Sequence, residues 1–382
     1  GGHPMNAAAL WRFLRHRVFI FDPWLSTVLL AISLISLVTM YSAAGEGSER
    51  LVVHARNLGM AVLITWLVAS LDPRHLRAVA IPIYLVGLVL LFGVELMGIT
   101  AKGAKRWLDL GFTRIQPAEL MKIAIPLMLA WFFHISQNRL RSRYVHLMAI
   151  MLLVLPVALV GRQPDLGTAI LIGSAGAFVI YFAGLSWRVI LGSLVVGLAA
   201  MPLLWLNMKP YQKERVLTMI DPTNDPLGKG FHIIQSTIAV GSGGMQGKGW
   251  LRGTQAHLDF VPERTTDFIF SVYAEEFGLV GTGILLALYT AFIARGLMIA
   301  SQAQSLFSRL LAASMTMIVF TYAFVNIGMV IGILPVVGVP LPFMSYGGTA
   351  LVTLGVGCGM LMCIAHENAM QRHRAGRQFI FG

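Results

Sequence analysis

Residues 23–43 read PWLSTVLLAISLISLVTMYSA, an apolar run without a charged side chain. A run of about 20 such residues is long enough for a helix to cross the hydrocarbon core of a membrane. Nine further apolar runs of similar length follow, at residues 52–71, 78–99, 117–135, 144–161, 166–184, 187–207, 267–296, 308–333 and 344–366. The sequence therefore predicts an all-α, polytopic membrane protein with ten transmembrane helices.

The overall composition points to the same class of protein. Of the 382 residues, 57% are hydrophobic and 12% are charged. A soluble globular domain carries about 25% charged residues, so this composition argues against a soluble protein. Residues 1–4 precede Met5 and resemble a cloning scar. We therefore expect residues 5–382 to form a single membrane domain.

The basic residues predict how the chain is oriented in the membrane. With the N- and C-termini cytoplasmic, the cytoplasmic connections carry about twice as many basic residues as the short outer segments, as the positive-inside rule requires. A large extracytoplasmic loop, residues 208–266, then lies between helices 7 and 8. Every lysine falls on the outer side or in the outer half of a helix: Lys102, Lys105, Lys122, Lys209, Lys213, Lys229 and Lys248. They indicate either an anionic ligand, such as a pyrophosphate, or contact with anionic lipid headgroups.

Ionisable residues lie at and inside the start of the fourth span. The preceding segment, residues 102–107, is basic and contains Arg106 and Trp107, which suits the level of the lipid headgroups. Glu119 and Lys122 are three residues apart, so they share a helix face and can pair. Charged groups inside a membrane are costly and usually functional. A structural salt bridge between helices is the alternative explanation.

Two other connections between spans carry informative residues. Asp165, between spans five and six, either caps the sixth helix or lines an outer cavity together with Arg162. Residues 332–342, GILPVVGVPLP, are apolar and contain three prolines. Non-helical backbone at membrane depth must be buried in protein or line a cavity. We expect this connection to form such a wall, suited to a long isoprenoid chain.

The long outer loop contains the glycine-rich segment GSGGMQGKG at residues 241–249. It is not a nucleotide-binding P-loop, because Gly249 follows Lys248 where that motif has Ser or Thr. We therefore expect no nucleotide cofactor. The segment either directs backbone N–H groups at an anion or forms a flexible turn after an interfacial helix at residues 231–240.

The most informative motif is VPERTTDFIF at residues 261–270. It places Glu263, Arg264 and Asp267 at the outer mouth of the eighth span. Glu275 and Glu276 would follow roughly 12 Å deeper along the same helix, at 1.5 Å per residue. Asp267 is either a helix N-cap or a catalytic acid–base group.

Several long segments together resemble the SEDS family (shape, elongation, division, sporulation) over essentially the whole chain. They are AKRWLDLGFTRIQPAELMKIA (104–124), GRQPDLGTAIL (161–171), DPLGKGFHIIQSTIAVGSGGMQGKGWLRGTQ (225–255), FVPERTTDFIFSVYAEEFGLVG (260–281) and NIGMVIGILPVVGVPLPFMSYGG (326–348). Arg264 favours the RodA branch over the division-specific FtsW branch. Many members have His where this chain has Thr265, so no role of that imidazole transfers.

The resemblance implies a peptidoglycan glycosyltransferase that polymerises lipid II into glycan strands during cell elongation and rod-shape maintenance. It implies a location in the bacterial inner membrane, with the active site facing the periplasm. The implied partners are a class B penicillin-binding protein, which is the crosslinking transpeptidase, together with lipid II and undecaprenyl pyrophosphate, and no nucleic acid. The family's essential aspartate falls on Asp267, and its polar cavity residues fall on Glu119 and Lys122. We expect Arg106, Lys248 and Arg264 to bind substrate as well.

The chemistry of this reaction fits these residue types. An α-linked donor that gives a β-linked glycan implies one inverting displacement, which needs one base, and Asp267 is the candidate. The leaving pyrophosphate needs positive charge from Lys, Arg or a divalent cation such as Mg²⁺ or Mn²⁺, whose ligands are unknown. A lipid II flippase is the alternative function, although the polar residues cluster on the outer side. A non-catalytic scaffold would leave the outer charges unexplained.

Overall fold

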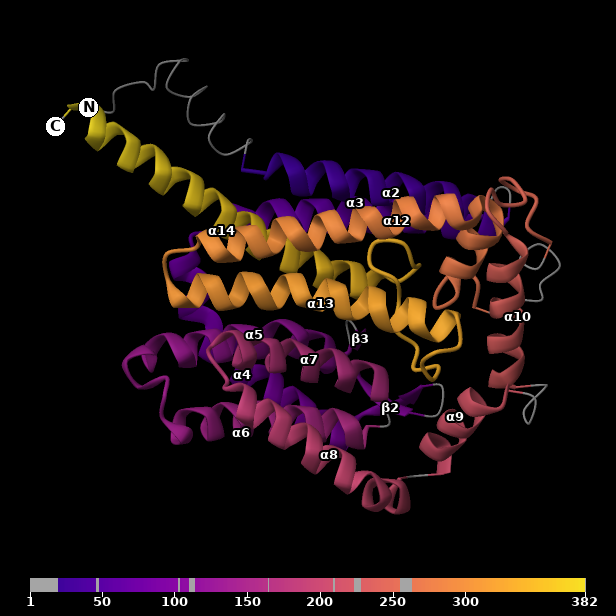
Figure 1. The fold of residues 1–382 in the computed structure, drawn as a ribbon, viewed down its shortest axis with the longest axis horizontal. Helices are drawn as coiled ribbons and strands as arrows, with labels where there is room; N and C mark the ends of the chain where they lie inside the picture. Colours follow the sequence, from indigo (N-terminus) through magenta and orange to yellow (C-terminus); the bar gives the residue numbers. More distant parts are fainter. Residues whose placement is uncertain are drawn as a thin grey trace.

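The structure is a computed structural model that describes residues 20–45, 48–101, 104–109, 114–163, 165–208, 210–222, 228–254 and 263–381. Its helices are α2 (Pro23–Ala44), α3 (Glu49–Ala69), α4 (Pro73–Met97), α5 (Pro117–Ile135), η1 (Gln137–Arg139), α6 (Arg143–Arg162), α7 (Leu166–Phe182), α8 (Trp187–Asn207), α9 (Pro210–Ile220), α10 (Lys229–Ser242), α12 (Ile269–Gln302), α13 (Leu306–Val330) and α14 (Gly348–Phe381). Figure 1 shows most of the long helices running side by side along the longest axis.

Within the described residues, eight helices are long and apolar enough to cross a membrane, namely α2, α3, α4, α5, α6, α12, α13 and α14. Two more apolar helices, α7 and α8, coincide with the predicted spans at 166–184 and 187–207. The prediction of an all-α, polytopic membrane protein is therefore confirmed at this level. The last helix differs from its prediction because α14 continues from the apolar stretch to Phe381, well beyond residue 366.

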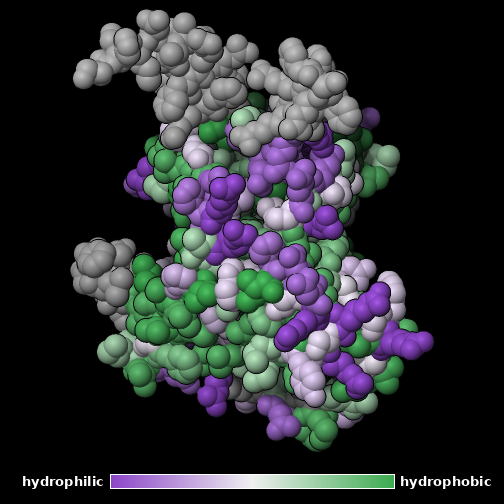
Figure 2. All heavy atoms as spheres, turned by 90° about the vertical axis from the view of Figure 1, so that its left-hand side faces the viewer, coloured by the Kyte–Doolittle hydropathy of each residue, from purple (hydrophilic) through white to green (hydrophobic). Residues whose placement is uncertain are grey.

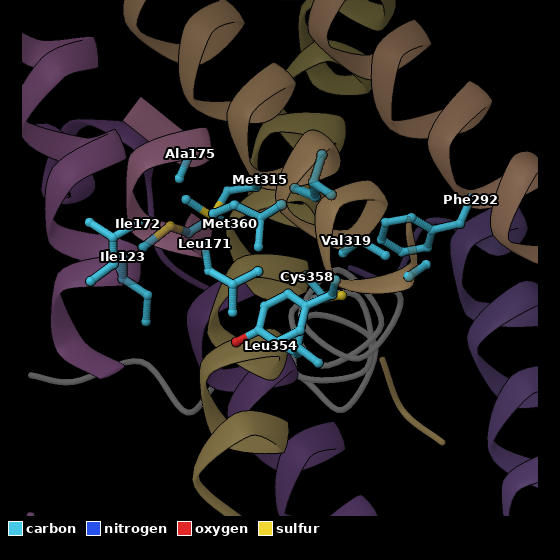
Figure 3. Packing of buried hydrophobic residues seen from close by; sticks show 14 of the residues in the cluster. Ile123, Leu171, Ile172, Ala175, Phe292, Met315, Val319, Leu354, Cys358 and Met360 are labelled. Carbon is cyan, nitrogen blue, oxygen red and sulfur yellow. The ribbon is translucent and has the colours of Figure 1, made fainter. Parts of the chain in front are cut away.

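The contacts of α13 and α14 organise the core. The α13 helix packs against α12, α7, α5 and α14, and α14 makes its most extensive contact with α3. Figure 3 shows side chains of α5, α7, α12, α13 and α14 meeting in one apolar cluster, with Met315, Val319 and Cys358 near its centre. None of the described side chains of α8 is buried, and this helix lies at the lower edge of the molecule in Figure 1.

Small residues allow α14 to lie close to α3. A Cβ atom on Gly355 would stand 2.9 Å from the carbonyl oxygen of Ala61, and one on Gly359 would stand 2.6 Å from Cβ of Val68. Both distances are too short for a side chain, so only glycine permits this approach. A small residue at every fourth position is a known device for close packing of membrane helices.

A small antiparallel sheet precedes α5 and was not predicted from the sequence. It consists of β1 (Ile99–Ala101), β2 (Ala104–Asp109) and β3 (Arg114–Ile115), in the order β1-β2-β3. Trp107 pairs with Ile99 across the first strand pair, and Leu108 pairs with Ile115 across the second. The basic segment around Arg106 is therefore held on a strand rather than in an irregular interfacial loop.

The α12 helix is broken near its start, which corrects the predicted position of Glu275 and Glu276. Gly278 has φ +63° and ψ −159°, a backbone conformation that interrupts the helix. Residues 269–277 therefore form a short segment of their own, and the long apolar part begins after the break. The two glutamates belong to the short segment. They therefore do not lie on the membrane-spanning part of α12, where an unbroken helix would have placed them.

Candidate active site

A polar cavity of about 420 Å³ lies between the β-sheet, α5, α7, the turn before α12 and the connection between α13 and α14. Of the six residues predicted to act on substrate, four line this cavity: Arg106, Glu119, Lys122 and Asp267. Residues that are far apart in the sequence are therefore brought into one site, and carboxylates and basic groups share its walls.

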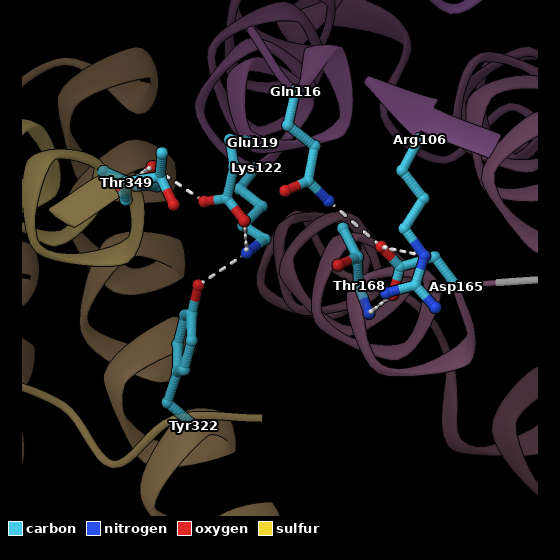
Figure 4. A network of polar contacts seen from close by, with 9 residues as sticks. Arg106, Gln116, Glu119, Lys122, Asp165, Thr168, Tyr322 and Thr349 are labelled. Atoms are coloured by element: carbon cyan, nitrogen blue, oxygen red, sulfur yellow. Dashed lines mark hydrogen bonds and ion pairs between the residues drawn. The ribbon is translucent and has the colours of Figure 1, made fainter. Parts of the chain in front are cut away.

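A buried network is centred on Lys122. Its Nζ atom donates a hydrogen bond to Oε1 of Glu119 at 2.6 Å and another to the hydroxyl of Tyr322 at 2.8 Å (Figure 4). The second carboxylate oxygen of Glu119 accepts a hydrogen bond from Thr353 at 3.0 Å. The side chain of Lys122 is only 3% exposed. The pairing predicted from the spacing of Glu119 and Lys122 is confirmed, and α13 and α14 fix the pair from two further sides.

A second polar group lies on the neighbouring wall and is organised by Asp165. Its Oδ1 atom accepts a hydrogen bond from the N–H of Thr168 at 3.2 Å, which caps α7. Its Oδ2 atom accepts a hydrogen bond from Gln116 at 3.1 Å and lies 3.8 Å from Nε of Arg106 (Figure 4). Asp165 therefore both caps the helix and lines the cavity. Arg162 does not line the cavity, and its guanidinium lies 3.7 Å from a carboxylate oxygen of Glu95 instead.

Asp267 lies in the turn at residues 263–268, just before α12. The helix begins at Ile269 and its N-cap residue is Phe268, so the interpretation of Asp267 as the N-cap is wrong. The backbone carbonyl of Asp267 accepts a hydrogen bond from the amide of Asn326 at 2.8 Å. This bond ties the turn to α13 through the backbone and leaves the carboxylate of Asp267 at the cavity wall.

Further hydrogen bonds hold this turn against the segment before α14. The hydroxyl of Ser345 donates to the carbonyl of Thr266 at 2.6 Å, and the N–H of Tyr346 donates to the carbonyl of Thr265 at 2.8 Å. Glu263, at the start of the turn, has φ +51°, which is uncommon for a residue other than glycine. The turn therefore has a defined shape, and its position depends on both α13 and the segment before α14.

The proline-rich connection at residues 332–342 also lines the cavity. Gly338 has φ +73°, and a Cβ atom there would stand 3.4 Å from Oδ2 of Asp267. The carbonyl of Val339 accepts a hydrogen bond from Asn326 at 2.7 Å, so one amide joins the connection to the Asp267 turn. The prediction that this non-helical backbone lines a cavity is confirmed. Contact with an isoprenoid chain stays a prediction.

The remaining two predicted residues lie apart from the cavity walls. Nζ of Lys248 donates to Oε1 of Glu275 at 2.7 Å, and the Glu275 side chain is fully buried. Arg264 is half-buried in the turn at residues 263–268. The structure thus gives Lys248 an internal partner, and substrate binding by Lys248 and Arg264 stays a prediction.

The glycine-rich segment at residues 241–249 packs directly against the backbone of the short helical segment that carries Glu275 and Glu276. The N–H groups of Lys248 and Gly249 donate to the carbonyls of Glu275 and Glu276, each at 3.0 Å. These two donors bind protein backbone, so they are not directed at an anion. The flexibility of the turn stays a prediction. A Cβ atom on Gly247 would stand 2.1 Å from the carbonyl of Glu276. Glycine is needed there because two backbones meet directly.

Among the polar residues of the site that were missed in the sequence are Tyr322, Asn326 and Thr353. Tyr322 and Asn326 are one helical turn apart in α13 and are both fully buried. Their signal was present, because polar side chains at helical spacing inside an apolar span usually face other protein groups. Their partners were not predictable, since Lys122 and the Asp267 turn come from distant parts of the chain.

Comparisons with known proteins agree with the fold. Residues 17–370 match the family model FtsW/RodA/SpoVE, described as cell cycle protein. The chain is 48% identical over 352 residues to the peptidoglycan glycosyltransferase MrdB of Escherichia coli K12, which covers 91% of this chain and 94% of that protein. It is 31% identical to the peptidoglycan glycosyltransferase RodA of Treponema pallidum, over 90% and 97% of the two chains.

Two solved structures resemble the fold closely. A chain from work on the structural coordination of polymerization and crosslinking by a peptidoglycan synthase complex has a TM-score of 0.77 and 34% identity, covering 91% of this chain and 98% of that one. The rod shape determining protein RodA of Thermus thermophilus has a TM-score of 0.67 and 29% identity, covering 91% and 97%.

Fold and site together define a polytopic helical membrane protein with a charged cavity between its helices. The chain belongs to the FtsW/RodA/SpoVE family of cell cycle proteins, and the resemblance to the RodA branch of the SEDS proteins is confirmed.

Proposed function

We propose that this protein is a peptidoglycan glycosyltransferase that polymerises lipid II into glycan strands during cell elongation and rod-shape maintenance. The observation that carries the proposal is the cavity itself, where the carboxylate of Asp267 and the buried Glu119–Lys122 pair line one space of about 420 Å³. The relatives named above are glycosyltransferases of this kind.

The residues of the cavity fit a single displacement. Asp267 takes the proton from a sugar hydroxyl of the acceptor while the hydroxyl oxygen bonds to the anomeric carbon of the donor. The bond from that carbon to the pyrophosphate oxygen breaks, and undecaprenyl pyrophosphate leaves with the electron pair. One displacement inverts the configuration at the anomeric carbon. Lys122 and Arg106 supply positive charge where the negative charge of the leaving group develops.

The network around Lys122 suits this role. Glu119 and Tyr322 fix the ammonium group through two short hydrogen bonds, so it is held in place before substrate arrives. Groups already in position need no rearrangement during the reaction, which increases their effect on the transition state. Glu119 therefore acts as a positioning residue for Lys122.

A divalent cation, Mg²⁺ or Mn²⁺, belongs to the proposal as an additional source of positive charge. The described residues contain no group of three or more His, Cys, Asp or Glu side chains able to hold a metal ion. Magnesium is often bound by one or two carboxylates together with substrate phosphates. Asp267 and Glu263, which both line the cavity, fit that mode of binding. The metal would stabilise the charge of the pyrophosphate.

We place the protein in the bacterial inner membrane with ten spans, both termini in the cytoplasm and the cavity facing the periplasm. The apolar α7 and α8 supply the two spans beyond the eight longest helices. The start of α2 and the end of α14 lie at one end of the molecule in Figure 1, and α9 and α10 lie at the other. This arrangement supports the outer placement of the loop at residues 208–266.

The partner in this proposal is a class B penicillin-binding protein of the elongation complex. A polymerase embedded in the membrane has to pass its strand to a transpeptidase outside, and a related chain was solved as part of a peptidoglycan synthase complex. We expect the partner's single membrane helix to bind this chain and polymerisation to increase in the complex. Co-purification should fail when that helix is replaced by an unrelated one. Undiminished co-purification would contradict an interface within the membrane.

The direct test of the proposed function uses the purified protein and fluorescent lipid II. Polymerisation gives a ladder of glycan strands on a gel, and a glycan hydrolase should remove the ladder. Absence of strands, with the partner present and with Mg²⁺ or Mn²⁺ supplied, would contradict the proposal.

A further inference from the structure

A second cavity lies at the opposite end of the helices from the active site. Its volume is about 910 Å³, and it lies between the connection from α5 to α6 and the connection from α7 to α8. Both connections lie on the left-hand side in Figure 1, and Figure 2 shows that hydrophilic side chains gather on this end of the molecule. Nothing in the proposed polymerisation reaction uses this cavity.

The cavity carries positive charge, and none of the described residues that line it is a carboxylate. Arg141, Arg143 and His146 line it. Between Glu119 and Glu214 the sequence has a single acidic residue, which belongs to the active-site cavity at the other end of α7. The structure records no ion pair for Arg141 or Arg143 with the described residues.

Two other arginines near the same end of the helices have acidic partners. Nη2 of Arg295 lies 2.6 Å from a carboxylate oxygen of Asp22, and Nε of Arg74 lies 4.0 Å from one of Asp72. Basic residues are expected on this face by the positive-inside rule. Arg141 and Arg143 have no such ion pair with the described residues, which leaves their charge available to an anionic ligand.

The rest of the cavity wall is apolar and open. Tyr144 is 83% exposed, Leu147 is 56% exposed and Val189 is 48% exposed, and all three line the cavity. Side chains of this kind on a membrane helix suit an acyl chain. Positive charge at one end and apolar surface along the helices match the two parts of a phospholipid.

Two helix N-termini strengthen the positive potential of the cavity. The α6 helix starts at Arg143 after Ser142, and α8 starts at Trp187 after Ser186. Neither serine hydroxyl accepts a capping hydrogen bond. The first N–H groups of both helices therefore lack a side-chain cap, and the partial positive charge of a helix start favours an anion.

We propose that this cavity binds an anionic phospholipid, with the phosphate at Arg141, Arg143 and the start of α6, and an acyl chain along Leu147 and Val189. Basic pockets between transmembrane helices on the cytoplasmic side are known to bind anionic headgroups. The assignment to the cytoplasmic leaflet depends on the topology proposed above, whereas the selectivity for an anionic headgroup does not.

The test compares lipid binding to delipidated, purified protein by native mass spectrometry. Phosphatidylglycerol is titrated against phosphatidylethanolamine with the same acyl chains. The double variant Arg141→Gln, Arg143→Gln should bind phosphatidylglycerol roughly 25-fold more weakly, about fivefold for each arginine. Its binding of phosphatidylethanolamine, which has a phosphate but no net charge, should fall by less. The matched control is Arg74→Gln, Arg309→Gln, which removes the same charge from exposed positions outside the cavity and should bind phosphatidylglycerol like the wild type.

Two outcomes would overturn the proposal. If the Arg141→Gln, Arg143→Gln variant retains phosphatidylglycerol, the arginines do not hold a lipid headgroup, and a protein partner in the cytoplasm becomes the alternative. If both double variants lose it equally, net charge alone explains the binding. The melting temperature of each variant shows that the comparison is made between folded proteins.

Discussion

Asp267→Asn is expected to lower glycan polymerisation by about 10²–10⁴-fold, the usual cost of removing general-base assistance. Asparagine keeps the size of the side chain but can neither take a proton nor hold a cation as a carboxylate does. The turn that carries Asp267 is fixed through its backbone carbonyl, which asparagine also has. The fold should therefore survive the change, and the loss should appear in turnover. The measurement is polymerisation of lipid II by the purified variant with its transpeptidase partner, over a range of Mg²⁺ and Mn²⁺ concentrations.

The matched control for this variant is Glu95→Gln. Glu95 is a carboxylate of α4 with a side chain 41% exposed, and its partner is Arg162. Exposed ion pairs contribute little to stability, about 0–1 kcal/mol, so this change should leave polymerisation and melting temperature nearly unaltered. Polymerisation by Asp267→Asn within a few-fold of the wild type would remove Asp267 from the catalytic role and make Glu263 the next acid to examine.

Lys122→Ala is the second substitution with a large expected effect, and it should abolish polymerisation. Loss of one positioned donor to a developing anion costs about 10²–10³-fold in turnover, and here a full positive charge is lost as well. The change also leaves the carboxylate of Glu119 without its cation. Removing one partner of a buried ion pair costs about 3–5 kcal/mol of stability. Activity should therefore be measured on protein that elutes and melts as a folded species.

A double variant separates the chemical role of Lys122 from a structural one. Glu119→Gln, Lys122→Met removes both charges together and retains similar volumes, so it should fold better than Lys122→Ala. If the pair only supports packing, this double variant should recover polymerisation. We expect it to stay inactive, because the positive charge at the leaving group is still missing. Near-normal activity of either variant would rule out the proposed role of Lys122.

Much of the fold could be predicted because its main determinant is local. An apolar run in the sequence predicts a membrane span, and α5 occupies residues 117–135 as predicted. The interfacial helix expected at residues 231–240 is α10, which covers them. The pair of Glu119 and Lys122 followed from helical spacing alone.

The features that were missed depend on contacts between distant segments. The break at Gly278 arises where the short segment carrying Glu275 meets the glycine-rich loop, and a Cβ atom on Gly278 would stand 2.3 Å from the nitrogen of Gly247. A lone glycine in a helical pattern was a weak signal for this break. Asp267 meets its support at Asn326 only because α13 packs beside the turn. No periodicity within one segment reports such a contact.

The central claim is that this chain itself makes glycan strands in a cavity open to the outer side. The most direct measurement places purified protein in liposomes, supplies fluorescent lipid II in the leaflet on the side of residues 228–254, and follows glycan length and lipid position in one sample. The account predicts glycan ladders with the wild type and their loss with Asp267→Asn. Movement of lipid II to the other leaflet without any ladder would contradict the account and identify a flippase. If neither glycan strands nor movement of lipid II is seen, the account is also contradicted, and a non-catalytic scaffold is the remaining explanation.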